Sequence, residues 1–344
     1  MRWDGQLVDG PAGDEGPALP GMPEVPGRIR VVRPPEFAGV TFHEVAARSA
    51  LNRVPAAAQV PFGWTINPYR GCTHGCVYCF ARGTHSYLEF DTGHDFDTQI
   101  VVKVNIAEVL RREVSRPSWP REHVALGTNT DPYQRAEGRY RLMPGIVAAL
   151  ADSGTPFSIL TKGTVLSRDL PMLSGLADPP GLAVSLALLD CELQATLEPG
   201  TPGPKARLEL IRRITDAGLS CSVLIAPILP YLADSTEQLA DLIGRLVDVG
   251  VTGVTGIVLH LRPGTRDWFF GWLGAQHPEL VPAYRKLYAR GSYADKDYRD
   301  EVHRRLAGAK ADAGLAGPTG MSARPVHPAP APGVVDGAEQ LTLL

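Results

Sequence analysis

The sequence predicts an α/β protein in which helices cover a parallel sheet. Six short runs of the chain are almost continuously apolar, and such runs are typical of strands buried on both faces of a parallel sheet. Amphipathic segments alternate with these runs, as helices that connect parallel strands do. Six strand–helix units form either a doubly wound sheet or a barrel that is open on one side. In both folds the ligand site lies at the carboxyl ends of the strands.

The expected elements follow one another in a regular order. Each strand is a short apolar run, and each helix repeats its apolar residues every three to four positions. In chain order we expect strand 63–67, helix 104–114, strand 123–129, helix 141–154, strand 156–163, helix 166–177, strand 181–189, helix 205–218, strand 221–229, helix 236–250 and strand 253–261.

Both ends of the chain are rich in Gly and Pro and offer little to bury. Such segments cannot offset their own ordering entropy, so we expect residues 1–35 and 308–344 to be disordered. One domain then spans 36–307, with a core at 60–270 and a helical extension at 271–307. No internal repeat or interior linker divides it.

The composition is ordinary for a soluble globular protein. The 344 residues are 44 % hydrophobic and 21 % charged, with a net charge of −3. We expect no signal peptide, because the N-terminus lacks a basic region followed by an apolar stretch. We expect no membrane span, because no apolar run approaches the required length of about 18 residues. Five cysteines do not form a disulfide framework, so a reducing cytoplasm is the expected location.

Three of the five cysteines lie together in NPYRGCTHGCVYCFAR (67–82), with the spacing C-x3-C-x2-C. They are Cys72, Cys76 and Cys79, and they follow the first strand, at the ligand-binding end of the sheet. A structural zinc site would need a fourth ligand, for which His74 or His85 are candidates. Three thiolates without a fourth suit a [4Fe–4S] cluster that leaves one iron open, since such clusters usually take four cysteines.

The cysteine spacing, with an aromatic residue before the last Cys and a strand in front, resembles the radical S-adenosylmethionine (SAM) superfamily. The resemblance covers about residues 60 to 270. It implies an open (β/α)6 partial TIM barrel and a [4Fe–4S] cluster whose open iron is chelated by SAM. It also implies reductive cleavage of SAM to a 5′-deoxyadenosyl radical, which abstracts hydrogen from a substrate. A one-electron reductant of the flavodoxin or ferredoxin type is then an expected partner.

Further motifs resemble the spore photoproduct lyase group, broadly labelled DNA repair photolyase-like. The stretches are NTDPYQRAE, LTKG, VSLALLD and LEPGTPGPKARLELI. The resemblance implies that Tyr78 flanks the adenine of SAM and that Asp131 receives its methionine amino group. Lys162 and Ser185 would contact the carboxylate or ribose, as an ammonium and a hydroxyl suit. Arg207, on the helix after EPGT, completes the expected SAM-binding set.

The chain also departs from that group. Spore photoproduct lyase looks to donate hydrogen from a cysteine near the end of its second strand, but residues 127–131 here (GTNTD) contain none. Phe80 follows the last cluster cysteine where that group has a tyrosine. Cys191, just past the fourth strand, is a candidate replacement donor, although both Cys191 and Cys221 are more typical of packed thiols.

The long segment after the cysteines, ARGTHSYLEFDTGHDFDTQIVVKV (81–104), is either a polar lid over the site or a plain hairpin. The lid would use His85, Tyr87, Glu89, Asp91, His94 and Asp97. A metal site made of His85 and His94 is a weaker alternative.

Two features raise the question of nucleic acid. Residues 282–310 hold eight Lys and Arg against four Asp and Glu, and four tyrosines, Tyr284, Tyr288, Tyr293 and Tyr298. They form either a nucleic-acid-binding face or helices that close the barrel. The terminal EQLTLL places Gln340, Leu341, Leu343 and Leu344 where peptides that dock on the DNA sliding clamp have their anchors.

We therefore expect a radical SAM enzyme with an unassigned substrate. A DNA-associated repair or modification enzyme without the cysteine donor is an alternative, as is an enzyme that modifies a peptide or small molecule. A non-catalytic iron–sulfur or zinc-binding module that docks on DNA is the alternative from another class.

Overall fold

The computed structural model describes residues 27–55, 58 and 60–315. The predicted disordered segments therefore lie largely outside the described residues, and the expected clamp-binding peptide, Gln340 to Leu344, lies wholly outside them. No helix of the described part is long and apolar enough to cross a membrane.

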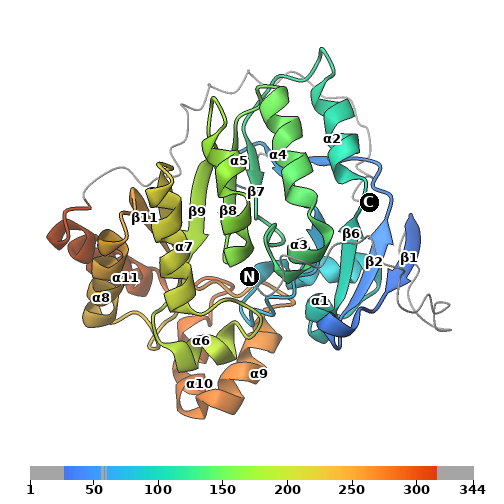
Figure 1. Cartoon of the computed structure of the whole chain (residues 1–344). Helices are drawn as coiled ribbons and strands as arrows, with labels where there is room; N and C mark the ends of the chain where they lie inside the picture. The colour runs from blue at the N-terminus through green and yellow to red at the C-terminus, as the bar shows by residue number, and fades with distance from the viewer. Residues whose placement is uncertain (1–26, 56–57, 59, 316–344) are drawn as a thin grey trace, which may run out of the picture.

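The main sheet carries six consecutive parallel strands and one antiparallel strand at its edge, in the order β11-β10-β9-β8-β7-β4-β3. This confirms the open (β/α)6 partial barrel (Figure 1). The strands are β3 (Leu51–Arg53), β4 (Trp64–Ile66), β7 (Val124–Leu126), β8 (Phe157–Thr161), β9 (Gly181–Ser185), β10 (Cys221–Ile228) and β11 (Gly253–Val258).

Helices cover the outer face of the sheet close to their expected positions (Figure 1). They are α2 (Ile106–Val114), α4 (Leu142–Asp152), α7 (Pro204–Asp216) and α8 (Thr236–Asp248). One expected helix differs: residues 166–177 form part of the 3-10 helix η4 (Thr164–Arg168) and the short α5 (Leu170–Ser174). Pro171 lies in the first turn of α5, where proline is tolerated, and it cannot donate the hydrogen bond that would continue a helix from η4.

A second, four-stranded sheet was not expected from the sequence. It has the order β1-β2-β6-β5, with β1 (Arg28–Val32), β2 (Thr41–Val45), β5 (Tyr69–Arg70) and β6 (Gln99–Lys103). The range 1–35, which we expected to be disordered, instead contains β1 and the first residue of the following 3-10 helix η1 (Pro35–Phe37). Arg30 faces Glu44 in the β1–β2 register and pairs with it at 2.5 Å, and such cross-strand charge pairs help to hold a sheet together.

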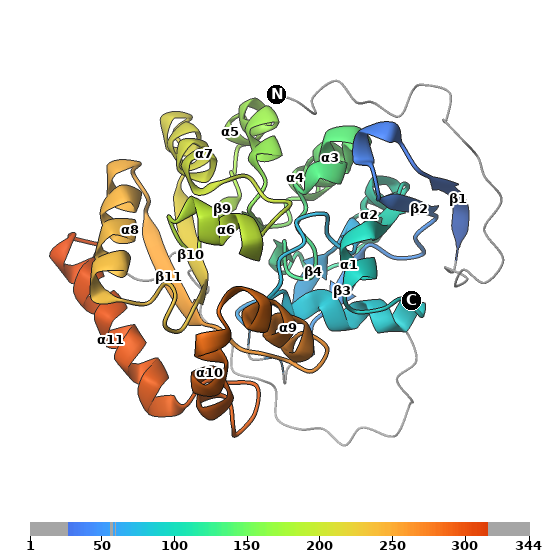
Figure 2. The ribbon, with the colours of Figure 1, turned by 90° about the horizontal axis from the view of Figure 1, so that it is seen from below.

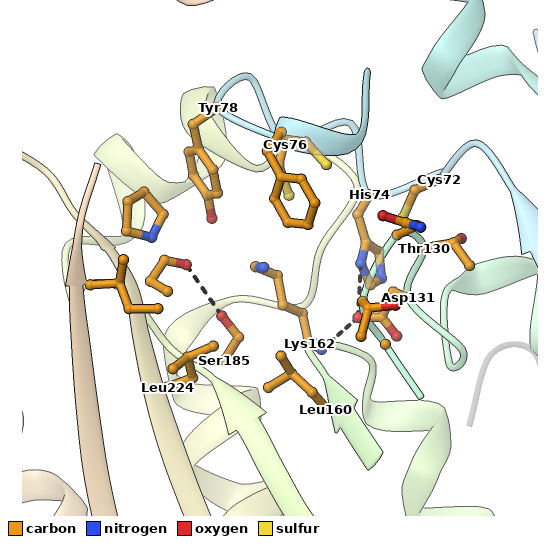
Figure 3. Close-up of a pocket in the computed structure, with 18 of the residues that line it drawn as sticks. Cys72, His74, Cys76, Tyr78, Thr130, Asp131, Leu160, Lys162, Ser185 and Leu224 are labelled. Carbon is orange, nitrogen blue, oxygen red and sulfur yellow. Dashed lines mark hydrogen bonds and ion pairs between the residues drawn. The ribbon is translucent and has the colours of Figure 1, made fainter. Parts of the chain in front are cut away.

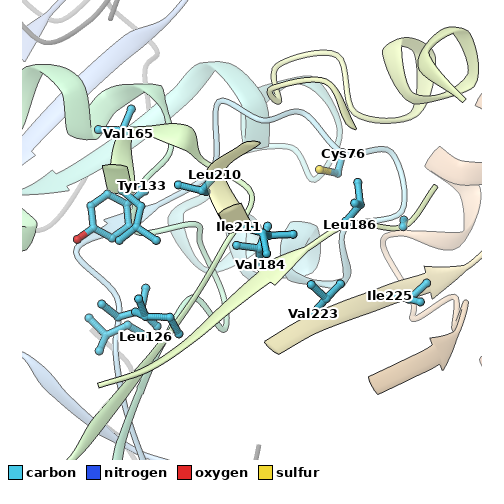
Figure 4. Packing of buried hydrophobic residues seen from close by; sticks show 14 of the residues in the cluster. Cys76, Leu126, Tyr133, Val165, Val184, Leu186, Leu210, Ile211, Val223 and Ile225 are labelled. Carbon is cyan, nitrogen blue, oxygen red and sulfur yellow. The ribbon is translucent and has the colours of Figure 1, made fainter. Parts of the chain in front are cut away.

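The core lies between the main sheet and its helices (Figure 4). Leu126, Val184 and Val223 come from three strands, and Leu210 and Ile211 come from α7; all are at most 2 % exposed. Burial of each such side chain stabilises the fold by roughly 1.5–3 kcal/mol. The thiol of Cys221 is also fully buried in this core.

The helical extension packs against the β11 edge of the barrel (Figure 2). It comprises α9 (Arg266–Gln276), the 3-10 helix η5 (Pro278–Leu280), α10 (Val281–Leu287) and α11 (Lys296–Asp312), so it continues five residues past the expected end at 307. Tyr284 and Tyr288 are fully buried and donate hydrogen bonds to the carbonyls of Pro230 and Leu259. Tyr298 donates to Asp234. These three tyrosines are packing residues, as the barrel-closing alternative predicts. The fourth, Tyr293, is 58% exposed and is not.

Candidate active site

A cavity of about 210 Å³ opens at the carboxyl ends of the parallel strands. Figure 3 shows cysteines of the loop after β5 on one side of it and polar side chains of the strand ends on the other. Its lining residues are Cys72, His74, Cys76, Tyr78, Cys79, Phe80, Gly127, Thr128, Asn129, Thr130, Asp131, Leu160, Thr161, Lys162, Ser185, Leu224, Ala226, Pro227, Ile257, Val258, Leu259 and His260. Seven of the eight site residues predicted from the sequence are among them.

Hydrogen bonds from side chains that follow β7 hold the start of the cysteine loop (residues 71–79). Gln134 accepts from the Thr73 N–H at 2.8 Å and donates to the Gly71 carbonyl at 3.2 Å. The Thr130 hydroxyl donates to the same carbonyl at 2.8 Å. These bonds satisfy backbone groups that the loop would otherwise bury unpaired, so the positions of the cysteines are set by the rest of the fold.

Two further side chains hold the end of the loop. The buried Arg82 donates twice to the Cys76 carbonyl, at 3.1 and 3.0 Å, and pairs with Asp97 at 2.9 Å. The Thr265 hydroxyl, at the start of α9, donates to the Cys79 carbonyl at 2.8 Å. The bonds from Arg82 are charge-assisted, and such bonds are roughly twice as strong as neutral ones. The helical extension thus supports the site directly.

The EPGT segment (198–201) is the third support. The Gly200 N–H donates to the His74 carbonyl at 2.9 Å, and the Val77 N–H donates to the Leu197 carbonyl at 2.9 Å. A Cβ at Gly200 would lie 1.9 Å from the Thr73 carbonyl oxygen. Only glycine lets the two segments approach this closely.

Burial raises the pKa of all three thiols in the loop. It raises the pKa of Cys76 to about 12, although the Lys162 ammonium opposes this, and it raises those of Cys72 and Cys79 as well. A coordinating metal deprotonates such thiols outright.

The donor set fits an iron–sulfur cluster better than zinc. Three soft sulfur ligands suit a cluster, and no fourth cysteine lines the cavity. His85, one candidate fourth zinc ligand, is fully buried away from the cavity with its Nε2 2.9 Å from the Gln99 carbonyl oxygen. His74 does line it, but its Nδ1 lies 3.4 Å from Asp131. Across residues 27–55, 58 and 60–315, no three His, Cys, Asp or Glu side chains form a ready-made metal site.

Tyr78 belongs to a buried chain of polar groups that ends at Arg207. Its hydroxyl donates to Glu198, which pairs in turn with Arg207. Burial acts to raise the pKa of Glu198, but Arg207 and Lys162 outweigh it and lower that pKa to about 2. Glu198 is therefore a carboxylate at neutral pH.

Arg207 is not among the residues that line the cavity, and its expected contact with SAM stays a prediction. Its other donors go to the carbonyls of Pro202 and Ser185, at 2.8 and 3.0 Å, and to the Thr201 hydroxyl at 3.0 Å. With all its bonds made inside the protein, Arg207 positions Glu198 and the end of β9.

Lys162 and Ser185 are the polar side chains that the strand ends direct toward the cysteines (Figure 3). Burial acts to lower the pKa of Lys162, but Cys76 and Glu198 outweigh burial, and the net effect raises that pKa. The ammonium therefore stays charged. Its Nζ lies 5.8 Å from the centre of the Tyr78 ring. Within the described part of the chain, the Ser185 hydroxyl makes one long hydrogen bond, 3.5 Å, to the Ala226 carbonyl. Both groups can take an anionic or hydroxylated ligand in the cavity.

Asp131 lines the cavity, but its carboxylate is already occupied. Its Oδ1 accepts from the Thr161 hydroxyl at 2.6 Å and from the Tyr133 N–H at 2.9 Å. Its Oδ2 accepts from the Lys162 N–H at 2.6 Å and lies near His74. Burial lowers the pKa of His74 to about 4, so its ring is neutral. Asp131 thus positions the end of β8, and its expected contact with the methionine amino group of SAM stays a prediction.

The segment after the cysteines is neither the expected lid nor a hairpin. It forms most of the 3-10 helix η3 (Phe80–Leu88), which begins one residue earlier, and α1 (His94–Thr98) before β6. None of residues 81–104 lines the cavity, although Phe80 just before them does. His94 is exposed while His85 is buried, and the weaker metal site made of these two is not formed. Cys191 is exposed at the start of α6 (Cys191–Leu197) and does not line the cavity either.

Sequence reasoning missed several residues of the site. Glu198 was seen only as part of a motif, and nothing in the sequence indicates that it binds Tyr78. Thr128 and His260 could have been found, because they follow β7 and β11 at the edge of the sheet where ligands bind. Their side chains carry buried polar atoms, Oγ1 and Nε2, without a hydrogen-bond partner among the described residues.

Two known proteins are similar to this chain in sequence. Uncharacterized protein Rv2578c of Mycobacterium tuberculosis is 58% identical over 321 residues, which are 92% of this chain and 94% of that protein. Uncharacterized protein ORF301 of Acidianus two-tailed virus is 31% identical over 208 residues, 58% of this chain and 68% of that protein.

A solved spore photoproduct lyase variant with bound AdoMet and dinucleoside spore photoproduct has a similar fold. Its TM-score is 0.59 at 14% identity, and the match covers 79% of each chain. At that identity the likeness shows the fold alone. The family model described as Radical SAM superfamily matches residues 66–259, which include the cysteine loop and the strands from β7 to β11. The chain belongs to the radical SAM superfamily.

Proposed function

We propose that this radical SAM enzyme binds a [4Fe–4S] cluster through Cys72, Cys76 and Cys79 and cleaves SAM reductively. When bound, the cluster supplies the electron that splits SAM into methionine and a 5′-deoxyadenosyl radical, which takes hydrogen from the substrate. The observation that carries the proposal is that these three thiols, and no fourth cysteine, line the same cavity as Lys162 and Ser185.

The protein's own groups have separate tasks in this scheme. Lys162 provides a charge for the SAM carboxylate, and Ser185 provides a hydroxyl for its polar groups. Tyr78 offers its ring to the cavity while Glu198 fixes its hydroxyl. Such preorganised groups hold a ligand in one orientation, which is what a reaction with a short-lived radical needs.

The product radical is not quenched by a cavity cysteine outside the cluster set. Among the described residues, the only thiols that line the cavity are those of the three loop cysteines, and Cys191 lies exposed elsewhere. The reaction therefore differs from one that relies on a cysteine donor beside the substrate. The specific reaction class follows from the substrate, which binding experiments can identify.

Two further proposals rest on the same chemistry. An exogenous one-electron donor of the flavodoxin or ferredoxin type supplies the electron. The enzyme works in a reducing cytoplasm, because the five cysteines of the chain are all free in the structure and thiol ligands survive there.

The metal proposal can be tested by its spectroscopic signature. The full chain is purified without oxygen, reconstituted with iron and sulfide, and reduced, and electron paramagnetic resonance is recorded with and without SAM. We expect about four irons per chain and a spectrum that changes when SAM binds. Cys76→Ala should abolish both, whereas the exposed Cys191→Ser should retain both. Tightly bound zinc, or a cluster that survives in Cys76→Ala, would refute the assignment.

A further inference from the structure

Three aromatic rings form a row that starts inside the cavity and runs out to the surface. Phe80 and His260 line the cavity, and their ring centroids lie 6.2 Å apart with an angle of 27° between the planes. The ring of Tyr293 continues the row, 5.5 Å from His260 at 23°. We call these three residues the aromatic row.

The backbone fixes this arrangement. His260 and Tyr293 form an isolated antiparallel bridge, and the Leu261 N–H donates to the Ser292 carbonyl at 2.6 Å next to it. Phe80 is fixed because it follows Cys79, whose carbonyl is bonded to Thr265. Rings held on separate, anchored segments keep their alignment without a ligand, which lowers the entropy cost of binding one.

The row is not hydrophobic packing. Phe80 is 38% exposed and Tyr293 is 58% exposed, whereas the neighbouring Tyr284 and Tyr288 are fully buried. Exposed aromatic faces beside a cavity are a feature of binding surfaces more than of cores. Part of the ring surface of Phe80 and of Tyr293 is therefore accessible to a ligand.

Two guanidinium groups flank the row. Arg262 lies over the ring of Phe80, 5.1 Å from its centroid, and Arg299 lies over Tyr293 at 5.5 Å. No acidic side chain pairs with Arg262 within the part of the chain that the structure describes, and its side chain is exposed. It can therefore meet an anion without first breaking an ion pair.

The inner end of the row also offers polar atoms to a ligand. The Nε2 of His260 and the Oγ1 of Thr128 are buried, line the cavity and have no hydrogen-bond partner among the described residues. Burial, with Arg262 nearby, lowers the pKa of His260, so its ring is neutral and can donate and accept. Unpaired buried polar groups cost free energy, and a ligand with complementary atoms removes that cost.

We propose that the aromatic row binds an unpaired nucleic-acid strand and leads one of its bases into the cavity. Planar bases match the exposed rings, phosphates match the flanking guanidinium groups, and the polar edge of a base matches the unpaired atoms of Thr128 and His260. The proposal rests on the proposed function for what then happens to the base. A strand that is already unpaired binds without the cost of opening a duplex.

Fluorescence anisotropy tests the proposal without any turnover. The probe is a fluorescein-labelled oligothymidylate, titrated with the anaerobic, reconstituted full chain at two salt concentrations, and the same sequence annealed to its complement is the comparison. We expect saturable binding of the single strand, tighter than binding of the duplex. Tyr293→Ala should weaken binding by roughly 5- to 150-fold, the range that loss of one base stack gives, and Tyr293→Trp should restore it.

Matched variants separate stacking from general charge. Arg262→Ala should weaken binding. It should also reduce the slope of the logarithm of affinity against the logarithm of salt concentration by about 1, the value for one phosphate contact. Tyr87→Ala and Arg245→Ala remove an exposed tyrosine and an exposed arginine elsewhere on the surface, and both should bind like wild type. Absence of saturable binding by the wild type would overturn the proposal, as would a Tyr293→Ala protein that binds like Tyr87→Ala.

The two proposals fail in different ways. SAM cleavage by the wild type, compared with Cys76→Ala, tests the radical chemistry and needs no oligonucleotide. Oligonucleotide binding tests the aromatic row and needs no reductant. If the wild type cleaves SAM but its oligonucleotide binding does not depend on Tyr293, only the proposal for the aromatic row is refuted. If binding depends on Tyr293 but the wild type does not cleave SAM, only the radical chemistry is refuted.

Discussion

Replacement of Gly200 by alanine should displace the cysteine loop. The new Cβ would lie 1.9 Å from the Thr73 carbonyl oxygen and 3.0 Å from the Cα of His74, whereas real Cβ contacts essentially never fall below 3.0 Å. The atoms that the new Cβ would meet are backbone atoms of Thr73 and His74, which cannot rotate away as a side chain can. The EPGT segment and the cysteine loop must therefore separate by more than 1 Å. The bond from the Gly200 N–H to the His74 carbonyl must then lengthen from 2.9 Å or break.

The cost can be estimated from similar overpacking. Insertion of a methyl group into a close-packed site costs about 1–3 kcal/mol, from strain and displaced backbone. A larger effect is expected on metal binding, because ligand groups must be held within about 0.5 Å of their working positions. We therefore expect Gly200→Ala to fold with reduced stability and to hold far less iron per chain after reconstitution.

Gly203→Ala is the matched control. It lies in the same segment, and the nearest atom to its added Cβ would be 3.9 Å away, an ordinary contact. Urea unfolding of the two proteins and iron analysis after identical reconstitution give the comparison. If Gly200→Ala matched Gly203→Ala in both stability and iron content, the close approach of the EPGT segment would not position the cysteine loop, and the reasoning would fail.

Three more substitutions probe the other supports of the site. Glu198→Gln leaves the buried Arg207 without its charge partner and should cost about 3–5 kcal/mol at pH 7. The pKa of Glu198 is lowered from 4.5 to about 2, so its stabilising effect is complete above pH 4.5 and is lost as the pH falls toward 2. Urea unfolding should therefore show that the difference in unfolding free energy between wild type and Glu198→Gln shrinks over that range. Lys162→Met should weaken SAM binding by about 10-fold or more, as loss of a charge-assisted bond does, while the exposed Lys205→Met should not; equal affinities by calorimetry would argue against a carboxylate contact. Tyr78→Phe keeps the ring and removes one bond to Glu198, so thermal unfolding should show a loss of about 1–2 kcal/mol with SAM affinity retained; a large loss of affinity alone would assign the hydroxyl to the ligand.

The sequence predicts the parallel barrel and the cavity well, because both depend on local patterns. Apolar runs identify the strands, and residues after a strand reach the same edge of the sheet. Lys162 and Ser185 follow from that rule together with the family resemblance. The three loop cysteines follow from their spacing, the aromatic residue before the last of them and the strand in front.

Arg207 shows what the resemblance could not supply. It lies three and four positions before Leu210 and Ile211 on α7, which places it on the buried face of the helix. That periodicity indicates a structural arginine, and attention to it would have predicted an internal partner. The partner itself, Glu198, could not be inferred, since the contact depends on how the EPGT segment folds back.

The second sheet was missed for a different reason. β5 has two residues and β1 lies beside a Gly- and Pro-rich stretch, so neither gives a long periodic signal. Both strands gain their stability from pairing with distant segments, which sequence patterns do not reveal. The same holds for the aromatic row, whose members are far apart in the chain and meet only in the fold.

The formation of 5′-deoxyadenosine tests the central claim most directly. The reconstituted wild type and Cys76→Ala are each incubated without oxygen with SAM and dithionite, and the nucleoside is measured by chromatography. The account predicts 5′-deoxyadenosine from the wild type and none from Cys76→Ala. Equal amounts from the two proteins, or none from a wild type that holds its full iron and binds SAM, would contradict it.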